Sequence, residues 1–278
     1  MTDADRTGTA PLIQLNGPLA RRHHVRTIGH GPDIVVFGHG FGTDQHAWDG
    51  IVDAVPARAT VILFDLPGTG PLLPDGFDPG DYRHLADFAD DFLDLLEELG
   101  VARCSFVGHS VAGAVGILSA VEMPERFERL VLLNASPRYI NDAGYVGGFE
   151  PDDIVALLDS MAANYQSWVA GFAPAAVGED VPSAVEQFTT TLLAMRPDVT
   201  IRVARTIFES DIRALLPQVR VPTVLIHSRN DIAVSPQAAY YLHRNIGGSR
   251  LVWIDADGHL PHLSSPALVR SAVRDALA

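Results

Sequence analysis

Short apolar runs alternate with helical patterns along most of the chain. Six runs rich in Val, Ile, Leu and Phe are typical of buried strands: 34–37, 61–64, 105–107, 130–133, 221–226 and 251–254. Residues 84–99 instead place apolar side chains at helical spacing, and Gly100 is a usual helix-ending residue. Continuous apolar strands that alternate with helices indicate an α/β fold with a mostly parallel sheet covered on both faces.

The alternation breaks between residues 137 and 212, where no strand-like run occurs. Helical patterns occur near 151–164, 165–171, 183–195 and 198–209, and Pro151 and Pro197 suit first-turn positions. An all-helical insert after a strand predicts a cap over the carboxyl edge of the sheet, where ligands bind. We therefore expect a mobile N-terminal extension, a two-part core and an inserted cap, with the respective ranges 1–20, 21–136 with 213–278, and 137–212.

The composition suits a soluble globular protein and excludes several classes of partner. The 278 residues are 47% hydrophobic and carry a formal net charge of −14. Such an acidic chain repels phosphate backbones, so we expect no nucleic-acid partner. No apolar run approaches the roughly 18 residues of a membrane helix, and the polar N-terminus is unlike a secretion signal. The expectation is a cytoplasmic protein with no membrane partner.

The chain holds one cysteine and no lysine. Cys104 lies at the start of an apolar run and is predicted to be a core residue. A single cysteine excludes an intrachain disulfide and a thiolate zinc cluster. The absence of lysine excludes Schiff-base chemistry and a P-loop. We expect neither a cofactor nor a metal.

The stretch GHSVAG (108–113) directly follows the predicted strand 105–107 and opens a helical pattern over 111–122. It resembles the strand–turn–helix elbow that presents a nucleophilic serine, here Ser110, although Ala112 stands where that motif usually has glycine. Ala112 still meets the need for a small residue. The alternative interpretation is an ordinary tight turn between a strand and a helix.

A serine nucleophile needs a base and an acid that orients the base. Asp231 and His259 follow the last two predicted strands, and the order Ser110, Asp231, His259 is that of α/β-hydrolases. His262 competes with His259, but Gly258 frees the loop before His259 and Pro261 stiffens the chain before His262. Asp255 and Asp257 are weaker rivals to Asp231, because they lie too near His259 in the sequence.

The oxyanion of an acyl-transfer reaction needs two N–H donors. The amide of Val111, the residue after the nucleophile, is one candidate. Phe41, in the glycine-rich stretch 38–42 after the first predicted strand, is the other. This stretch lacks the G-x-G-x-x-G spacing, which argues against dinucleotide binding.

Several strings resemble the α/β-hydrolases that include the bacterial stress-signalling hydrolase RsbQ and the plant karrikin and strigolactone receptors. They are GHGFGTDQHAW (38–48), GHSVAG (108–113), ASPRYIND (135–142), GGFE (147–150), GFAPAAVG (171–178), TLLAMRPD (191–198), TIFESD (206–211) and DGHLPHLSSP (257–266). The resemblance covers residues 22–278 and implies an α/β-hydrolase fold with four cap helices in a V over a mostly apolar pocket. It implies that the pocket is lined or bordered by Phe41, His109, Tyr139, Phe149, Trp168, Phe172, Phe188, Ile207, Phe208 and Ile232. Aromatic residues at helical spacing are also typical of a core.

Two functions follow from the motifs and the resemblance. The first is a serine hydrolase that acts on small apolar esters or butenolide-like lactones through an acyl-enzyme. The second is a ligand sensor with slow turnover that signals to a protein partner in a stress response. Serine at position 110 argues against the dehalogenases and epoxide hydrolases of this fold, which use an aspartate nucleophile. A cofactor-free lyase or perhydrolase with the same three residues stays as an alternative.

Overall fold

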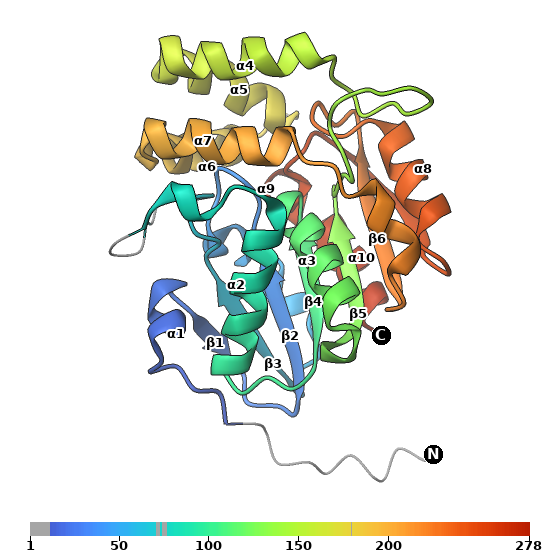
Figure 1. Ribbon diagram of the computed structural model, residues 1–278. Helices are drawn as coiled ribbons and strands as arrows, with labels where there is room; N and C mark the ends of the chain where they lie inside the picture. The colour runs from blue at the N-terminus through green and yellow to red at the C-terminus, as the bar shows by residue number, and fades with distance from the viewer. Residues whose placement is uncertain (1–11, 71–72, 74–76, 179) are drawn as a thin grey trace.

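Seven strands form one sheet at the centre of the molecule (Figure 1). The computed structural model describes residues 12–70, 73, 77–178 and 180–278. The strands are β1 (Arg26–Ile28), β2 (Asp33–Gly38), β3 (Ala59–Phe64), β4 (Cys104–His109), β5 (Phe127–Leu133), β6 (Thr223–Arg229) and β7 (Arg250–Asp257). Their order is β1-β3-β2-β4-β5-β6-β7, and every neighbouring pair is parallel except β1 with β3. All six predicted strands are confirmed, and the parallel sheet with them.

Strand β1 was not predicted. It has only three residues, of which Arg26 and Thr27 are polar, and it pairs with β3 at the edge of the sheet. Edge strands are often short and polar. None of the three residues of β1 is fully buried, so the strand has no buried apolar run. The hydrophobic pattern therefore contains no signal for it.

Helices cover both faces of the sheet. On one face lie α2 (Leu85–Glu98), α3 (Val111–Glu122) and α8 (Pro236–Asn245), and their buried side chains share one core cluster with the sheet. The other face is covered by α10 (Pro266–Leu277) together with short 3-10 turns at Gln45–Trp48 and Val52–Ala54. A short helix, α9 (Pro261–Ser264), precedes α10. The predicted helix over 84–99 is confirmed, and Gly100 follows it with a φ of +73°.

The chain between β5 and β6 carries four helices above the carboxyl edge of the sheet (Figure 1). They are α4 (Pro151–Ala163), α5 (Tyr165–Val177), α6 (Pro182–Ala194) and α7 (Pro197–Phe208), and all four expected helical segments are confirmed. Pro151 and Pro197 stand in the first turns of their helices, where a missing N–H costs nothing. Helix α4 packs on α5 and α7, and α5 packs on α6.

The N-terminal segment lies beside helix α2. Residues 1–11 of the expected extension lie outside the described residues, and helix α1 (Pro18–Arg22) crosses the expected boundary at residue 20. The Glu98 carboxylate accepts hydrogen bonds from the amides of Leu19 (3.0 Å) and Ala20 (2.7 Å). Among the described helices, none has the length and apolar character needed to cross a membrane.

Candidate active site

The elbow between β4 and α3 places Ser110, which is itself buried, at the end of a buried strand. Ser110 has φ +55° and ψ −117°, a strained backbone for a residue with a side chain, and its amide donates to the Leu133 carbonyl of β5 (2.9 Å). A Cβ atom on Gly108 would lie 2.9 Å from the carbonyl carbon of Ala112. Ala112 is fully buried and lies in the first turn of α3. A helical residue does not need the left-handed backbone conformation that favours glycine. Its methyl group therefore fits where the general motif has glycine.

Ser110, His259 and Asp231 lie in one chain of hydrogen bonds. His259 Nε2 lies 2.8 Å from Ser110 Oγ, and His259 Nδ1 lies 2.8 Å from Asp231 Oδ2. The other carboxylate oxygen of Asp231 accepts from the amides of Ala233 (2.8 Å) and Val234 (3.2 Å). Because the carboxylate only accepts, Nδ1 carries the proton and Nε2 is free to accept from the serine hydroxyl. The three residues that the sequence singled out are thus brought together from three separate strands.

The rival residues point elsewhere. The His262 ring stacks on Trp48 at a centroid distance of 5.0 Å, and within the described part of the chain neither of its nitrogens has a hydrogen-bond partner. Burial lowers the pKa of His262 to about 3, and the nearby His259 and His39 act in the same direction. Asp255 pairs with Arg229 at 3.1 Å, and Asp257 accepts from Asn230 at 3.0 Å.

His109 supports the histidine loop from beneath. It precedes Ser110 in the elbow and is almost completely buried, and its Nε2 lies 2.8 Å from the carbonyl oxygen of His259. Burial, followed by the neighbouring His262 and His259, holds the pKa of His109 well below its usual range. A neutral ring whose Nε2 faces a carbonyl must carry its proton there, so His109 donates to His259.

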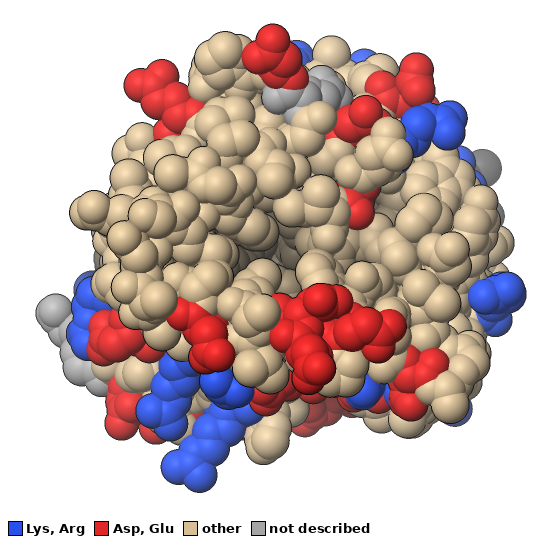
Figure 2. Space-filling view, turned by 90° about the horizontal axis from the view of Figure 1, so that it is seen from above, with Lys and Arg blue, Asp and Glu red and all other residues tan. Residues whose placement is uncertain are grey.

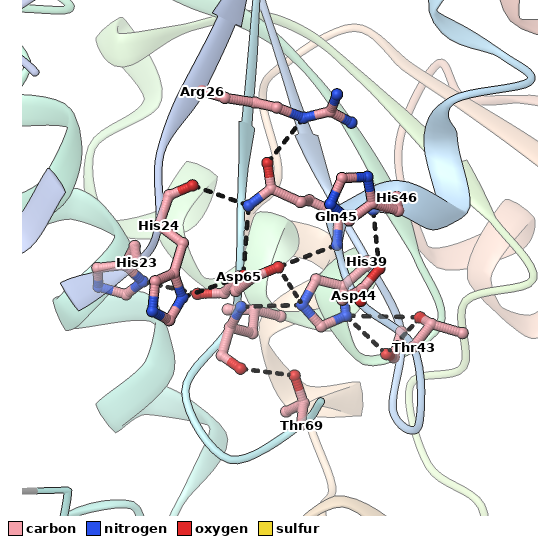
Figure 3. Close-up of polar contacts among 12 residues, drawn as sticks. His23, His24, Arg26, His39, Thr43, Asp44, Gln45, His46, Asp65 and Thr69 are labelled. Atoms are coloured by element: carbon pink, nitrogen blue, oxygen red, sulfur yellow. Dashed lines mark hydrogen bonds and ion pairs between the residues drawn. The ribbon is translucent and has the colours of Figure 1, made fainter. Parts of the chain in front are cut away.

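The glycine-rich loop after β2 is held from below by polar contacts (Figure 3). His39 Nε2 accepts from the Leu66 amide (3.1 Å), and its Nδ1 lies 2.9 Å from the Gly40 carbonyl, which the Thr43 hydroxyl also contacts (2.9 Å). The Gln45 amide, just beyond the loop, donates to the carboxylate of Asp65, which follows β3 (2.9 Å). These contacts fix the path of the loop without using the amide of Phe41.

The two candidate oxyanion donors are the backbone amides of Phe41 and Val111. Among the residues that the structure describes, neither the Phe41 amide nor the Val111 amide donates a hydrogen bond to a protein acceptor. The Phe41 side chain packs against both the core cluster of the sheet and a second apolar cluster, formed mainly by buried residues of α5 and α6. Backbone donors without a partner at a strand end are available to an incoming oxyanion.

Most of the predicted pocket residues fall into two aromatic groups. In one, Tyr139 and Phe149 contact Phe208 at centroid distances of 5.2 and 6.1 Å. In the other, Phe172 lies 4.8 Å from Trp168 and 6.1 Å from Phe188. Ile207, on α7, is buried in the same core cluster as the sheet and α2, whereas Ile232 is 44% exposed. Burial raises the pKa of Tyr139 to about 12, an effect that its contact with the Ser110 hydroxyl partly offsets.

Seen from above, the molecule is hollowed near its centre, and most of the residues around the hollow are uncharged (Figure 2). Acidic side chains gather along one side of it. Within the described residues, no group of three His, Cys, Asp or Glu side chains is placed to hold a metal ion. Cys104 is buried, and burial raises the pKa of its thiol to about 12, which makes it inert as a nucleophile.

Two residues at this edge of the sheet were not predicted. Asn134 follows β5 and Ser228 lies near the end of β6, and both contact the loop that carries His259. Each is a polar residue at the carboxyl end of an apolar strand. That pattern singled out Asp231 and His259 and could also have singled out these two.

Comparison with known proteins places the chain among hydrolases. A family model described as "Alpha/beta hydrolase family" matches residues 35–272. Strigolactone esterase RMS3 of Pisum sativum is 44% identical over 262 residues, which are 94% of this chain and 98% of that protein. Karrikin insensitive 2 receptor CA of Petunia hybrida is 43% identical over 255 residues, or 91% and 94% of the two chains. The solved structure of a hydrolase from Oleispira antarctica aligns with a TM-score of 0.89 at 29% identity, covering 94% of this chain and 96% of that one.

Proposed function

Because this chain belongs to the alpha/beta hydrolase family and is an ester-bond hydrolase, we propose that Ser110, His259 and Asp231 are its catalytic triad. The observation that carries the proposal is the pair of 2.8 Å contacts that join Ser110 Oγ to His259 Nε2 and His259 Nδ1 to Asp231 Oδ2. A base within hydrogen-bond reach of the nucleophile, itself oriented by a carboxylate, is the arrangement that acyl transfer requires.

The reaction runs in two halves. Ser110 Oγ attacks the ester carbonyl while His259 Nε2 takes its proton, and the Asp231 carboxylate stabilises the imidazolium that forms. The amides of Phe41 and Val111 donate to the oxyanion of the tetrahedral intermediate. His259 then gives the proton to the departing alcohol oxygen, which leaves an acyl group on Ser110. Water then attacks the acyl carbonyl while His259 takes one of its protons. His259 returns that proton to Ser110 Oγ as the acid leaves, which restores the free serine.

We propose small apolar esters or butenolide-like lactones as substrates. The two aromatic groups around Phe208 and Phe172 supply apolar surface. Most of the residues around the hollow seen in Figure 2 are uncharged. An apolar pocket with few polar groups favours a small apolar ligand with one reactive carbonyl. The name of the Pisum sativum relative, a strigolactone esterase, supports this substrate class.

We propose that residues 137–212 form a cap over a core of residues 21–136 and 213–278. Helices α4–α7 lie between β5 and β6 in the chain and above the carboxyl edge of the sheet (Figure 1). Phe149, Trp168, Phe172, Phe188, Ile207 and Phe208 come from this segment, so the cap would determine which acyl and alcohol groups fit. Ile232, which is exposed, would lie at the rim of the pocket.

The second candidate function is a sensor that signals to a protein partner. One contact favours it: the Ala176 carbonyl at the end of α5 accepts from the His259 amide at 2.7 Å. A ligand that moves α5 would therefore also move the proposed base. In the opposite direction, a ligand group attached to His259 would move α5. The Petunia hybrida relative, named a receptor, supports the same idea.

Hydrolysis of p-nitrophenyl acetate separates the two functions. An esterase turns this ester over many times, and Ser110→Ala abolishes the turnover. A sensor shows slow turnover, a shift in melting temperature with butenolides, and ligand-dependent binding to a partner protein. Retention of full hydrolysis by Ser110→Ala would exclude the proposed triad.

A further inference from the structure

We propose that Asn134 is the positioning residue of the triad: its side-chain amide holds the segments that carry Asp231 and His259 in register with Ser110. This inference rests on the proposed function, because it assigns Asn134 a role through those three residues. Asn134 itself touches neither the serine hydroxyl nor the imidazole ring.

Asn134 stands where the three segments meet. It directly follows β5, and its backbone N–H donates to the Ile226 carbonyl of β6 (2.9 Å). The carbonyl of the preceding residue, Leu133, accepts from the Ser110 amide at 2.9 Å. The backbone around Asn134 is thus bonded to the nucleophile elbow on one side and to the strand leading to Asp231 on the other.

The side chain of Asn134 extends these links to the histidine loop. Its Oδ1 accepts from the Ser228 amide (2.9 Å), three residues before Asp231. Its Nδ2 lies 2.8 Å from Ser228 Oγ, 3.3 Å from the Gly258 carbonyl and 3.2 Å from the His259 carbonyl. The Ser228 hydroxyl also donates to the Gly258 carbonyl. One fully buried amide therefore bridges the acid segment and the base segment.

The chemistry of this position favours asparagine. Asn134 has a φ of +47°, a left-handed conformation that asparagine tolerates better than most residues with a side chain. Its amide offers an acceptor and two donors, and each has a partner here, so the buried network is satisfied. An aspartate of the same shape keeps the acceptor and loses the donors, and a glycine keeps the backbone conformation and loses both.

The network explains how the triad distances are maintained. The His259 carbonyl receives two donors from below, Asn134 Nδ2 and His109 Nε2, while the His259 amide is held from above by Ala176. Without the Asn134 amide, the His259 carbonyl keeps only His109 as a donor among the described residues. Because proton transfer depends on short and aligned contacts, a small displacement of the ring lowers kcat more than it weakens substrate binding.

The test compares Asn134→Gly and Asn134→Asp with the control Asn245→Asp. Asn245, at the end of α8, likewise loses a side-chain donor in that variant, its 2.8 Å hydrogen bond to the Tyr241 carbonyl, and it lies away from the three segments. Ester hydrolysis gives kcat and KM. Nitrogen-15 histidine spectra follow the Nδ1–H signal of His259, assigned by its loss in His259→Gln. We expect both Asn134 variants to lower kcat about 10- to 100-fold, with KM within about threefold, and to weaken or shift that signal. Asn245→Asp should leave kcat and the signal unchanged.

Two results would decide against the inference. Wild-type kcat and an unchanged Nδ1–H signal in a folded Asn134 variant would overturn the inference. An equal loss of kcat in Asn245→Asp would overturn it as well, because the effect would then be general destabilisation. Should Asn134→Gly not fold, the isosteric Asn134→Asp carries the comparison. Ser110→Ala in the same assay tests the proposed function separately, and the spectra test Asn134 without any substrate.

Discussion

Gly40 lies directly against the imidazole of His109. A Cβ atom on Gly40 would be 2.3 Å from His109 Nδ1 and 3.3 Å from Ser110 Cβ, and a real side chain does not tolerate the first of these distances. The close approach brings the loop that contains the Phe41 amide next to the elbow that contains the Val111 amide. The two proposed oxyanion donors thus depend on a glycine at position 40.

Replacing Gly40 with alanine is expected to separate the two donors. The added methyl group must push the loop away from the buried ring, and removal of one oxyanion donor typically costs about 100- to 1,000-fold in kcat. We expect Gly40→Ala to lower kcat by about 100-fold, measured with a p-nitrophenyl ester. Gly247→Ala is the control, because a Cβ atom there meets nothing within 4 Å. Unchanged kcat in folded Gly40→Ala would contradict the assignment of Phe41.

A second glycine sets the contact between α5 and the histidine loop. Gly178, which ends α5 with a φ of +73°, would place a Cβ atom 2.5 Å from Gly258 Cα. We expect Gly178→Ala to displace His259 through the Ala176 contact and to lower both kcat and the melting temperature. Gly171→Ala on the same helix is the matched control, because a Cβ atom there has open space. Equal activity of the two variants would show that α5 does not act on His259.

Acid should destabilise the protein through His262. Burial holds its folded-state pKa at about 3, against an ordinary value of 6.5. Below pH 6.5 the unfolded chain takes up a proton that the folded chain does not, so the free energy of unfolding falls as the pH falls toward 3. At pH 4.5 this single group lowers the free energy of unfolding by about 2.5 kcal/mol.

His262→Leu removes that proton uptake. Urea unfolding of the variant should therefore change less between pH 7 and pH 4.5 than unfolding of the wild-type protein, by about 2–3 kcal/mol. The control is His30→Leu, which replaces an exposed side chain and should leave the wild-type pH dependence in place. Parallel pH curves for wild type and His262→Leu would mean that His262 is not held neutral.

Local patterns in the sequence predicted much of the fold and the three proposed triad residues. Strands such as β2 and β4 are buried on both faces, so their apolar runs predict them directly. Ser110, Asp231 and His259 follow such strands, and parallel strands end at one edge of the sheet. The same rule could have found Asn134. Nothing in the sequence, however, distinguishes Asn134 from an asparagine in an ordinary turn after a strand.

Other features depend on contacts that no local pattern encodes. His109 reads as a pocket residue by resemblance, yet the structure uses its ring as a donor to the His259 carbonyl. The stack of His262 on Trp48 joins residues more than 200 positions apart in the chain. The contact of Gly178 with Gly258 likewise follows from how α5 meets β7, and not from either glycine's neighbours in sequence.

The most direct test of the central claim is the mass of the protein after reaction with a fluorophosphonate, which phosphonylates an activated serine oxygen with loss of fluoride. We predict one adduct per chain, mapped by peptide sequencing to Ser110, and none in Ser110→Ala. His259→Gln, which retains the serine and loses the base, should react far more slowly. An adduct on another residue, or equal labelling of Ser110→Ala, would contradict the account.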